Sequence, residues 1–224
     1  GTTTYNYNSN GHVVKIIVRD GSSHVDLRDG DDRWVVGVLN GSLDRIYLHG
    51  HNGKIIAVYN ADGSLRARFG YATKGNVPNF MMLANGNEFR IVSDYLGSVR
   101  LVINVANGKV VQRMDYDEFG QITQNTNPGF QPFGYVGGIV SDGSTYLTGF
   151  GERHYESDLG RCTTKDPILF NVGDTNLYGY VLADPMNKID PKGTLPPSVY
   201  TGAIGAVIGG FSGFRNSSSC SGGG

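Results

Sequence analysis

The chain has 224 residues, enough for one large domain or two small ones, and its net charge of −1 comes without a basic stripe, so nothing indicates nucleic acid as a partner. Glycine is unusually abundant at 34 residues, tyrosine contributes 13, and charged residues make up only 17%. This composition favours short strands joined by tight turns over long helices.

A Tyr-x-x-x-Gly unit recurs along the chain, at Tyr7–Gly11, Tyr59–Gly63 and Tyr116–Gly120. His49–Gly53 has His in the Tyr place, and Asp94–Gly97 is a shortened relative. Apolar and polar residues alternate after such units, as expected of a half-buried strand. Each unit therefore predicts a hairpin, and because a single hairpin cannot bury a face alone, the hairpins must stack into a larger sheet.

Asn-Gly and Asp-Gly pairs support the same interpretation, because glycine supplies the positive φ that tight hairpin turns need. The pairs are Asn10-Gly11, Asn52-Gly53, Asp62-Gly63, Asn107-Gly108 and Asp142-Gly143. No long amphipathic helix is found in residues 1–150, and Pro128, Gly129 and Pro132 predict a loop around 125–138. We therefore predict an all-β fold of antiparallel neighbours in one curved, repeat-built sheet.

Residues 151–193 carry a compact series of motifs rich in Asp-Pro pairs. In chain order these are Arg153-His-Tyr155, Gly160-Arg161, Lys165-Asp166-Pro167-Ile168, Asn176-Leu-Tyr178-Gly-Tyr180-Val181, Asp184-Pro-Met-Asn187 and Asp190-Pro-Lys-Gly193. Upstream lie Asp94-Tyr-Leu-Gly-Ser-Val-Arg100 and Tyr116-Asp-Glu-Phe-Gly120. In this order the motifs resemble the C-terminal end of Rhs/YD-repeat proteins, with their Rhs-associated core domain.

The resemblance implies that the YD repeats form part of a hollow shell, closed by a turn-rich C-terminal core or plug that acts as an aspartic autoprotease. It implies three parts: a YD-repeat β-shell over residues 1–150, the core over 151–194, and a Gly-rich apolar tail over 195–224. In the family the C-terminal piece, usually a toxin, stays inside the shell after the chain is cut behind the closing motif.

Peptide hydrolysis by carboxylates needs two close aspartates that share one proton, one acting as base and the other as acid. The positions that match the family's motifs are Asp166 and Asp190, with Lys165 and Arg153 as supporting cations. The competing interpretation is structural, since Asp-Pro is ordinary turn chemistry and a buried Arg is often a packed ion-pair partner. His154 is expected at the surface or at the edge of the core.

The chain departs from the family pattern where the cut is expected. Thr194 stands where the family usually has Leu, and Leu195 follows one place later. Cys162 replaces an aromatic residue, and the spacing from Asp166 to Asp190 is one residue longer than usual. The scissile bond is therefore Thr194–Leu195 by position, or the bond after Leu195 by residue type.

The tail contains an uncharged, Gly-rich stretch at 199–214, with overlapping G-x-x-x-G patterns at Gly205, Gly209 and Gly213. That spacing permits close packing of membrane helices, but the stretch is short for a full span. We expect it to be poorly ordered or extended unless it is held by the shell or by membrane contact, both of which stay open.

Two cysteines, Cys162 and Cys220, lie too far apart for a zinc pattern and are interpreted as unrelated thiols. We expect no cofactor and no metal. No signal peptide precedes the first strand pattern, and we interpret the chain as a fragment. The expected partners are its own C-terminal peptide or toxin and a secretion or injection machine, at a secreted or cell-surface location in bacteria.

An alternative function is a wall-associated adhesion module, in which exposed Tyr rings meet carbohydrate or partner proteins without proteolysis. A conventional hydrolase acting on other substrates finds no support in a Ser-His-Asp, Cys-His or metal-ligand arrangement.

Overall fold

The computed structural model describes residues 2–9, 11–18, 21–31, 33–140, 146–167 and 175–194. In these ranges the chain forms a 12-stranded sheet, whose strands pair in sequence order, and a 4-stranded sheet. All strand pairs are antiparallel, and the other regular elements of the described chain are short 3₁₀ turns such as η1 (Tyr135–Gly137) and η3 (Val181–Ala183). The prediction of an all-β, repeat-built sheet is confirmed.

The large sheet consists of twelve strands in simple up-and-down order. They are β1 (Thr4–Tyr7), β2 (Val13–Ile17), β3 (Ser23–Arg28), β4 (Trp34–Leu39), β5 (Ser42–His49), β6 (Ile55–Asn60), β7 (Leu65–Gly70), β8 (Phe80–Leu83), β9 (Glu88–Ser93), β10 (Val99–Asn104), β11 (Val110–Tyr116) and β12 (Ile122–Asn125). Each strand pairs with the strands before and after it in the sequence, so each repeat adds one hairpin to the sheet.

The repeat unit is a hairpin loop with one glycine in the left-handed region. At Asn60–Ser64, the Asn60 N–H donates to the Ser64 carbonyl at 2.9 Å and the Gly63 N–H to the Asn60 carbonyl at 3.0 Å. Gly63 has φ +80°, and the register between β6 and β7 shifts beside the turn. This is the geometry of a three-residue loop closed by a glycine bulge.

The same pair of backbone hydrogen bonds recurs at the other repeats. It is found at Asn8–His12, Gly50–Lys54, Leu83–Asn87, Asp94–Ser98 and Asp117–Gln121. The hairpin between β4 and β5 is different: Asn40 and Gly41 both have positive φ, as a two-residue type I′ turn requires. This Asn-Gly pair adds a hairpin turn to those predicted above, and Asp142-Gly143 lies outside the described residues.

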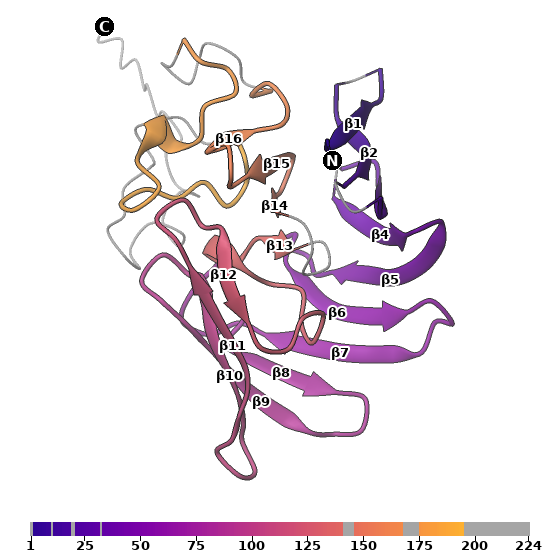
Figure 1. Cartoon of the computed structure of the whole chain (residues 1–224). Helices are drawn as coiled ribbons and strands as arrows, with labels where there is room; N and C mark the ends of the chain where they lie inside the picture. Colours follow the sequence, from indigo (N-terminus) through magenta and orange to yellow (C-terminus); the bar gives the residue numbers. More distant parts are fainter. Residues whose placement is uncertain are drawn as a thin grey trace, which may run out of the picture.

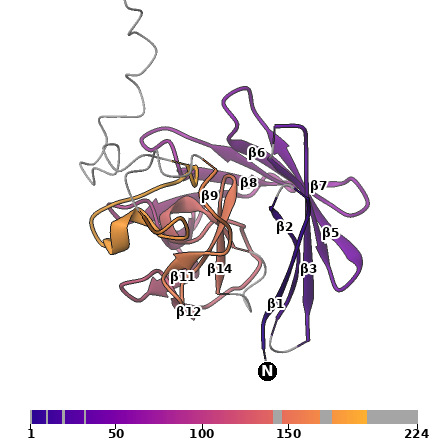
Figure 2. The same cartoon turned by 90° about the horizontal axis from the view of Figure 1, so that it is seen from above.

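The large sheet curves, and the small sheet lies on its concave side (Figures 1 and 2). Alternation along the strands sends one set of side chains into this concavity, where Trp34, Val58 and Val99 are almost fully buried. The segment after β12, which was expected to be a loop, runs into the same space and buries Phe133, whose ring meets Phe69 edge-on at 5.0 Å. Burial of this interior stabilises the curvature.

The small sheet is formed by β13 (Ile139–Val140), β14 (Leu147–Phe150), β15 (Arg153–Glu156) and β16 (Arg161–Cys162). It spans residue 150, the boundary expected between shell and core. All residues of β14 and β15 are buried, as expected of strands covered on both faces. The described residues contain no helix long and apolar enough to cross a membrane, and the stretch 199–214 lies outside them.

Candidate functional site

One buried guanidinium joins the two aspartates that the sequence singles out. Arg153 Nη2 lies 3.0 Å from Asp166 Oδ2 and 2.9 Å from Asp190 Oδ2. The exposed fractions of these side chains are 1%, 4% and 0%, so all three are withdrawn from water. Twenty-four positions separate the aspartates in the sequence, and only the fold brings them to one cation.

Each aspartate is held by backbone contacts as well as by Arg153. The Asp166 N–H donates to the Leu177 carbonyl at 2.8 Å, which fixes the Lys-Asp-Pro segment against the Asn176–Val181 motif. The Asp190 carbonyl accepts the Gly193 N–H at 3.2 Å, and its Oδ1 accepts the Thr194 N–H at 3.2 Å. The Asp190 carboxylate therefore directly contacts the chain at the expected cleavage position.

The closing motif is seated on the turn between β14 and β15. The Glu152 N–H donates to the Lys192 carbonyl at 3.2 Å. Gly193 has φ +69°, and a Cβ at this position would collide with the Phe150 carbonyl. Glycine is required here by both conformation and space, because an L-residue resists this φ and has no room.

Burial and charge act in opposite directions on Arg153. Burial alone lowers the pKa of its guanidinium, but the nearby acidic groups, Asp166 and Asp190 among them, outweigh that effect and hold the pKa above its usual value. Arg153 therefore remains a cation. Removing its carboxylate partners would leave an uncompensated buried charge, at a cost of about 3–5 kcal/mol. Cys162 is a free thiol, and burial raises its pKa to about 12, so it stays protonated at neutral pH.

An aromatic cluster encloses the same centre. The Phe150 and Tyr180 rings stack at 5.3 Å with an interplanar angle of 9°, and Tyr155 packs 4.4 Å from Tyr180. These rings shield the centre from bulk solvent, which strengthens the electrostatic interactions beside them.

The other predicted site residues lie differently. Lys165 is exposed, while its neighbour Asp166 is buried, so a supporting role for this cation has no geometric basis among the described contacts. Thr194 is half-buried, and Leu195 lies outside the described residues. Among the described residues, no group of three or more His, Cys, Asp or Glu side chains is arranged to hold a metal ion.

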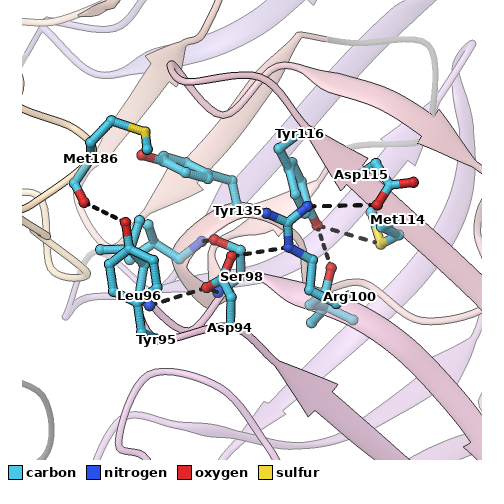
Figure 3. A network of polar contacts seen from close by, with 12 residues as sticks. Asp94, Tyr95, Leu96, Ser98, Arg100, Met114, Asp115, Tyr116, Tyr135 and Met186 are labelled. Carbon is cyan, nitrogen blue, oxygen red and sulfur yellow. Dashed lines mark hydrogen bonds and ion pairs between the residues drawn. The ribbon is translucent and has the colours of Figure 1, made fainter.

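The upstream Asp94–Arg100 motif connects the large sheet to this core (Figure 3). Asp94 Oδ1 accepts the N–H groups of Leu96 and Ser98 at 3.1 and 2.9 Å, and its Oδ2 accepts Arg100 Nε at 3.1 Å. The Tyr95 hydroxyl donates to the Met186 carbonyl at 2.7 Å. The motif is thus a turn stabilised by its own carboxylate, and its tip holds the core segment in place.

His154 was expected at the surface or core edge, but its side chain is only 2% exposed. Its ring stacks on Trp34 at 4.7 Å, and its Nε2 lies 3.3 Å from Asp26 Oδ2. The contact spans 128 positions, which local pattern cannot reveal. The available signal was strict alternation along Arg153-His-Tyr155, which puts His154 on the face opposite Arg153.

Comparison with known proteins identifies the family. The family model for the teneurin YD-shell matches residues 1–186. This chain belongs to the teneurin YD-shell family. Teneurin-4 of Homo sapiens is 32% identical over 199 residues, and Teneurin-3 of Danio rerio is 30% identical over 204 residues. Each alignment covers 84% of this chain but only 7% of the teneurin, so the YD-shell chain is compared with a small part of much longer relatives.

Solved structures show the same fold at lower sequence similarity. The crystal structure of TcdB2-TccC3 superposes with a TM-score of 0.60 at 17% identity, covering 85% of this chain and 10% of that one. The Photorhabdus luminescens Tc holotoxin pore gives a TM-score of 0.60 at 17% identity, covering 89% and 11%. These likenesses establish a YD-shell fold, and the resemblance to Rhs/YD-repeat proteins is confirmed.

Proposed function

We propose that this YD-shell chain is the C-terminal part of a secreted shell that encloses a C-terminal effector and releases it by self-cleavage after Asp190-Pro-Lys-Gly193. The observation that carries the proposal is the contact of Arg153 with both Asp166 and Asp190 in a buried site. A pair of close carboxylates beside a peptide bond is the arrangement that acid–base hydrolysis requires.

In the proposed reaction, the two aspartates share one proton. The ionised carboxylate removes a proton from water as the water oxygen attacks the Thr194 carbonyl carbon. The protonated partner then delivers its proton to the Leu195 nitrogen as the C–N bond breaks, leaving a new carboxyl and a new amino terminus. The contact from the Thr194 N–H to Asp190 Oδ1 supports this bond over the one after Leu195.

Arg153 would hold the two carboxylates in place. The domain division follows the same proposal: residues 1–150 supply shell wall, 151–194 the cleaving core, and 195–224 the first part of the released piece. Lys165, being exposed, fits the role of a surface cation better than that of a catalytic support.

The proposed partner is the chain's own C-terminal peptide or toxin, delivered by a secretion or injection machine. The fold shared with a Tc holotoxin pore supports an effector inside the shell. A secreted or cell-surface location is supported by Salivary gland surface protein 1 of Aedes aegypti, which is 33% identical over 132 residues. A bacterial source and membrane contact of 199–214 remain predictions.

The alternative is a non-cleaving adhesion module, favoured by the exposed Tyr7, Tyr95 and Tyr146 rings, which are 48%, 50% and 43% exposed. Asp166→Asn and Asp190→Asn separate the two functions. Asn keeps the shape of each side chain but cannot exchange the proton, so each variant should remain folded and full length while the unaltered protein yields two pieces. If the two aspartates only shape turns, the unaltered protein and both variants will each show the single mass of the uncut chain.

A further inference from the structure

The two faces of the β14–β15 hairpin contact different parts of the protein. Along β15, alternation directs Arg153 toward the aspartates and His154 toward the large sheet. The two residues are adjacent, so any shift of the His154 backbone also moves Arg153. The position of the Arg153 guanidinium therefore depends on the residues that contact the His154 face of the hairpin.

Three residues from β3 and β4 hold that face; we call Asp26, Arg28 and Trp34 the wall clamp. Asp26 Oδ2 lies 3.3 Å from His154 Nε2, with the Asp26 side chain 11% exposed. The Trp34 ring stacks on the imidazole with an interplanar angle of 19°. The Arg28 guanidinium lies over Trp34 at 5.2 Å, which completes a layered contact of His, Trp and Arg.

The wall clamp also grips the backbone of the hairpin. Arg28 Nη1 donates to the Gly151 carbonyl and Nη2 to the Glu152 carbonyl, each at 3.2 Å. Opposite His154 in the β14–β15 register lies Gly149, and the Trp34 ring occupies the space that a Cβ at Gly149 would need. Glycine at this strand position is thus explained by the close approach of the tryptophan.

The other side of the same turn carries the closing motif. The Glu152 N–H bonds the Lys192 carbonyl, and Gly193 packs on Phe150. The hairpin is therefore a continuous bridge from β3 and β4, at the start of the chain, to Arg153 and the Asp190–Gly193 segment at its end.

We infer that the wall clamp and His154 are positioning residues for the self-cleaving centre, so that the cut occurs only when β3 and β4 are in place against the hairpin. The inference rests on the proposed function and adds a requirement to it. If β3 and β4 are not packed against the hairpin, Arg153 is displaced and the chain is not cleaved. Displacement of a catalytic group by about 1 Å is enough to slow a reaction about 10²-fold.

The test compares cleavage rates of the full chain, measured by intact mass under conditions where each variant is folded. Asp26→Ala should cut on the order of 10–10² times more slowly than the unaltered chain. Asp26→Asn retains an oxygen that accepts a hydrogen bond from His154, and should recover much of the rate at a similar melting temperature. Asp62→Asn is the matched control, because Asp62 lies in the β6–β7 turn, where it accepts the Ser64 N–H, and should leave the rate unchanged.

A second variant perturbs the clamp from the hairpin side. Gly149→Ala places a methyl group against Trp34, whereas Gly70→Ala, in strand β7, meets only Phe80 at 3.7 Å and serves as its control. Slow cleavage by folded Gly149→Ala and by Asp26→Ala is the expected result. Normal cleavage by folded Asp26→Ala overturns the inference and leaves self-cleavage standing, whereas an uncut but folded unaltered chain overturns the proposed function itself.

Discussion

Gly151 and Lys192 are in direct contact, and a Cβ on Gly151 would collide with the Lys192 carbonyl. Gly151 also has φ +47°, a conformation that L side chains rarely adopt. The contact joins the β14–β15 turn to the closing Asp-Pro-Lys-Gly motif. The geometry of the aspartate site therefore depends on glycine at position 151 as well as on the charged side chains.

Gly151→Ala should therefore lower the free energy of unfolding by about 2–4 kcal/mol, combining backbone strain with overpacking. Gly63→Ala is the control: Gly63 has φ +80° but nothing within 4 Å of its Cβ position, so only the strain of about 1–2 kcal/mol applies. Urea denaturation of both variants gives the comparison. Equal losses would show that the Lys192 contact yields easily.

Asp94 should be more important to stability than Asp115, although both accept hydrogen bonds or ion pairs from Arg100 (Figure 3). Asp94 also accepts two backbone N–H groups in its turn, which Asp94→Ala leaves without their acceptor. We expect Asp94→Ala to cost about 2 kcal/mol or more. Asp115→Ala loses partly exposed ion pairs and should cost less than about 1 kcal/mol. Thermal denaturation distinguishes them, and a reversed order would contradict this ranking.

Cys162 predicts an alkaline loss of stability. Burial raises its pKa from the usual value of 9.0 to about 12, so the folded state holds the thiol proton more tightly than the unfolded state. The contribution is complete below pH 9 and is lost as the pH rises toward about 12. Replacing Cys162 by Ala should make the fall in unfolding free energy over this range less steep. An unchanged slope would mean that the buried tyrosines alone determine it.

Much of the fold follows from local pattern, because each Tyr-x-x-x-Gly unit determines one hairpin by its own turn chemistry. Asp62-Gly63 and Asn52-Gly53 illustrate this, since Gly63 and Gly53 both adopt positive φ. Asn40-Gly41, an equally clear turn signal that was not among the predicted turns, also adopts positive φ at both residues. The repeats also predicted one curved sheet, but not the segment and the small sheet that pack on its concave side, because those contacts join distant parts of the chain.

The candidate site could be predicted only in part. Asp166, Asp190 and Arg153 came from motif order, and the structure brings them together. Lys165 stood in the same motif but lies outside the buried centre, because its neighbour occupies the inward-facing position. The partners of His154 come from β3 and β4, and no local spacing encodes a contact between residues 26 and 154.

The central claim is tested most directly by intact mass spectrometry of the folded, unaltered full-length protein that carries this chain. We expect two pieces that stay associated, with the upstream piece ending at Thr194 and the downstream piece beginning at Leu195. A single mass equal to the whole chain, from protein shown to be folded, would contradict self-cleavage and leave the YD shell without an enzymatic role.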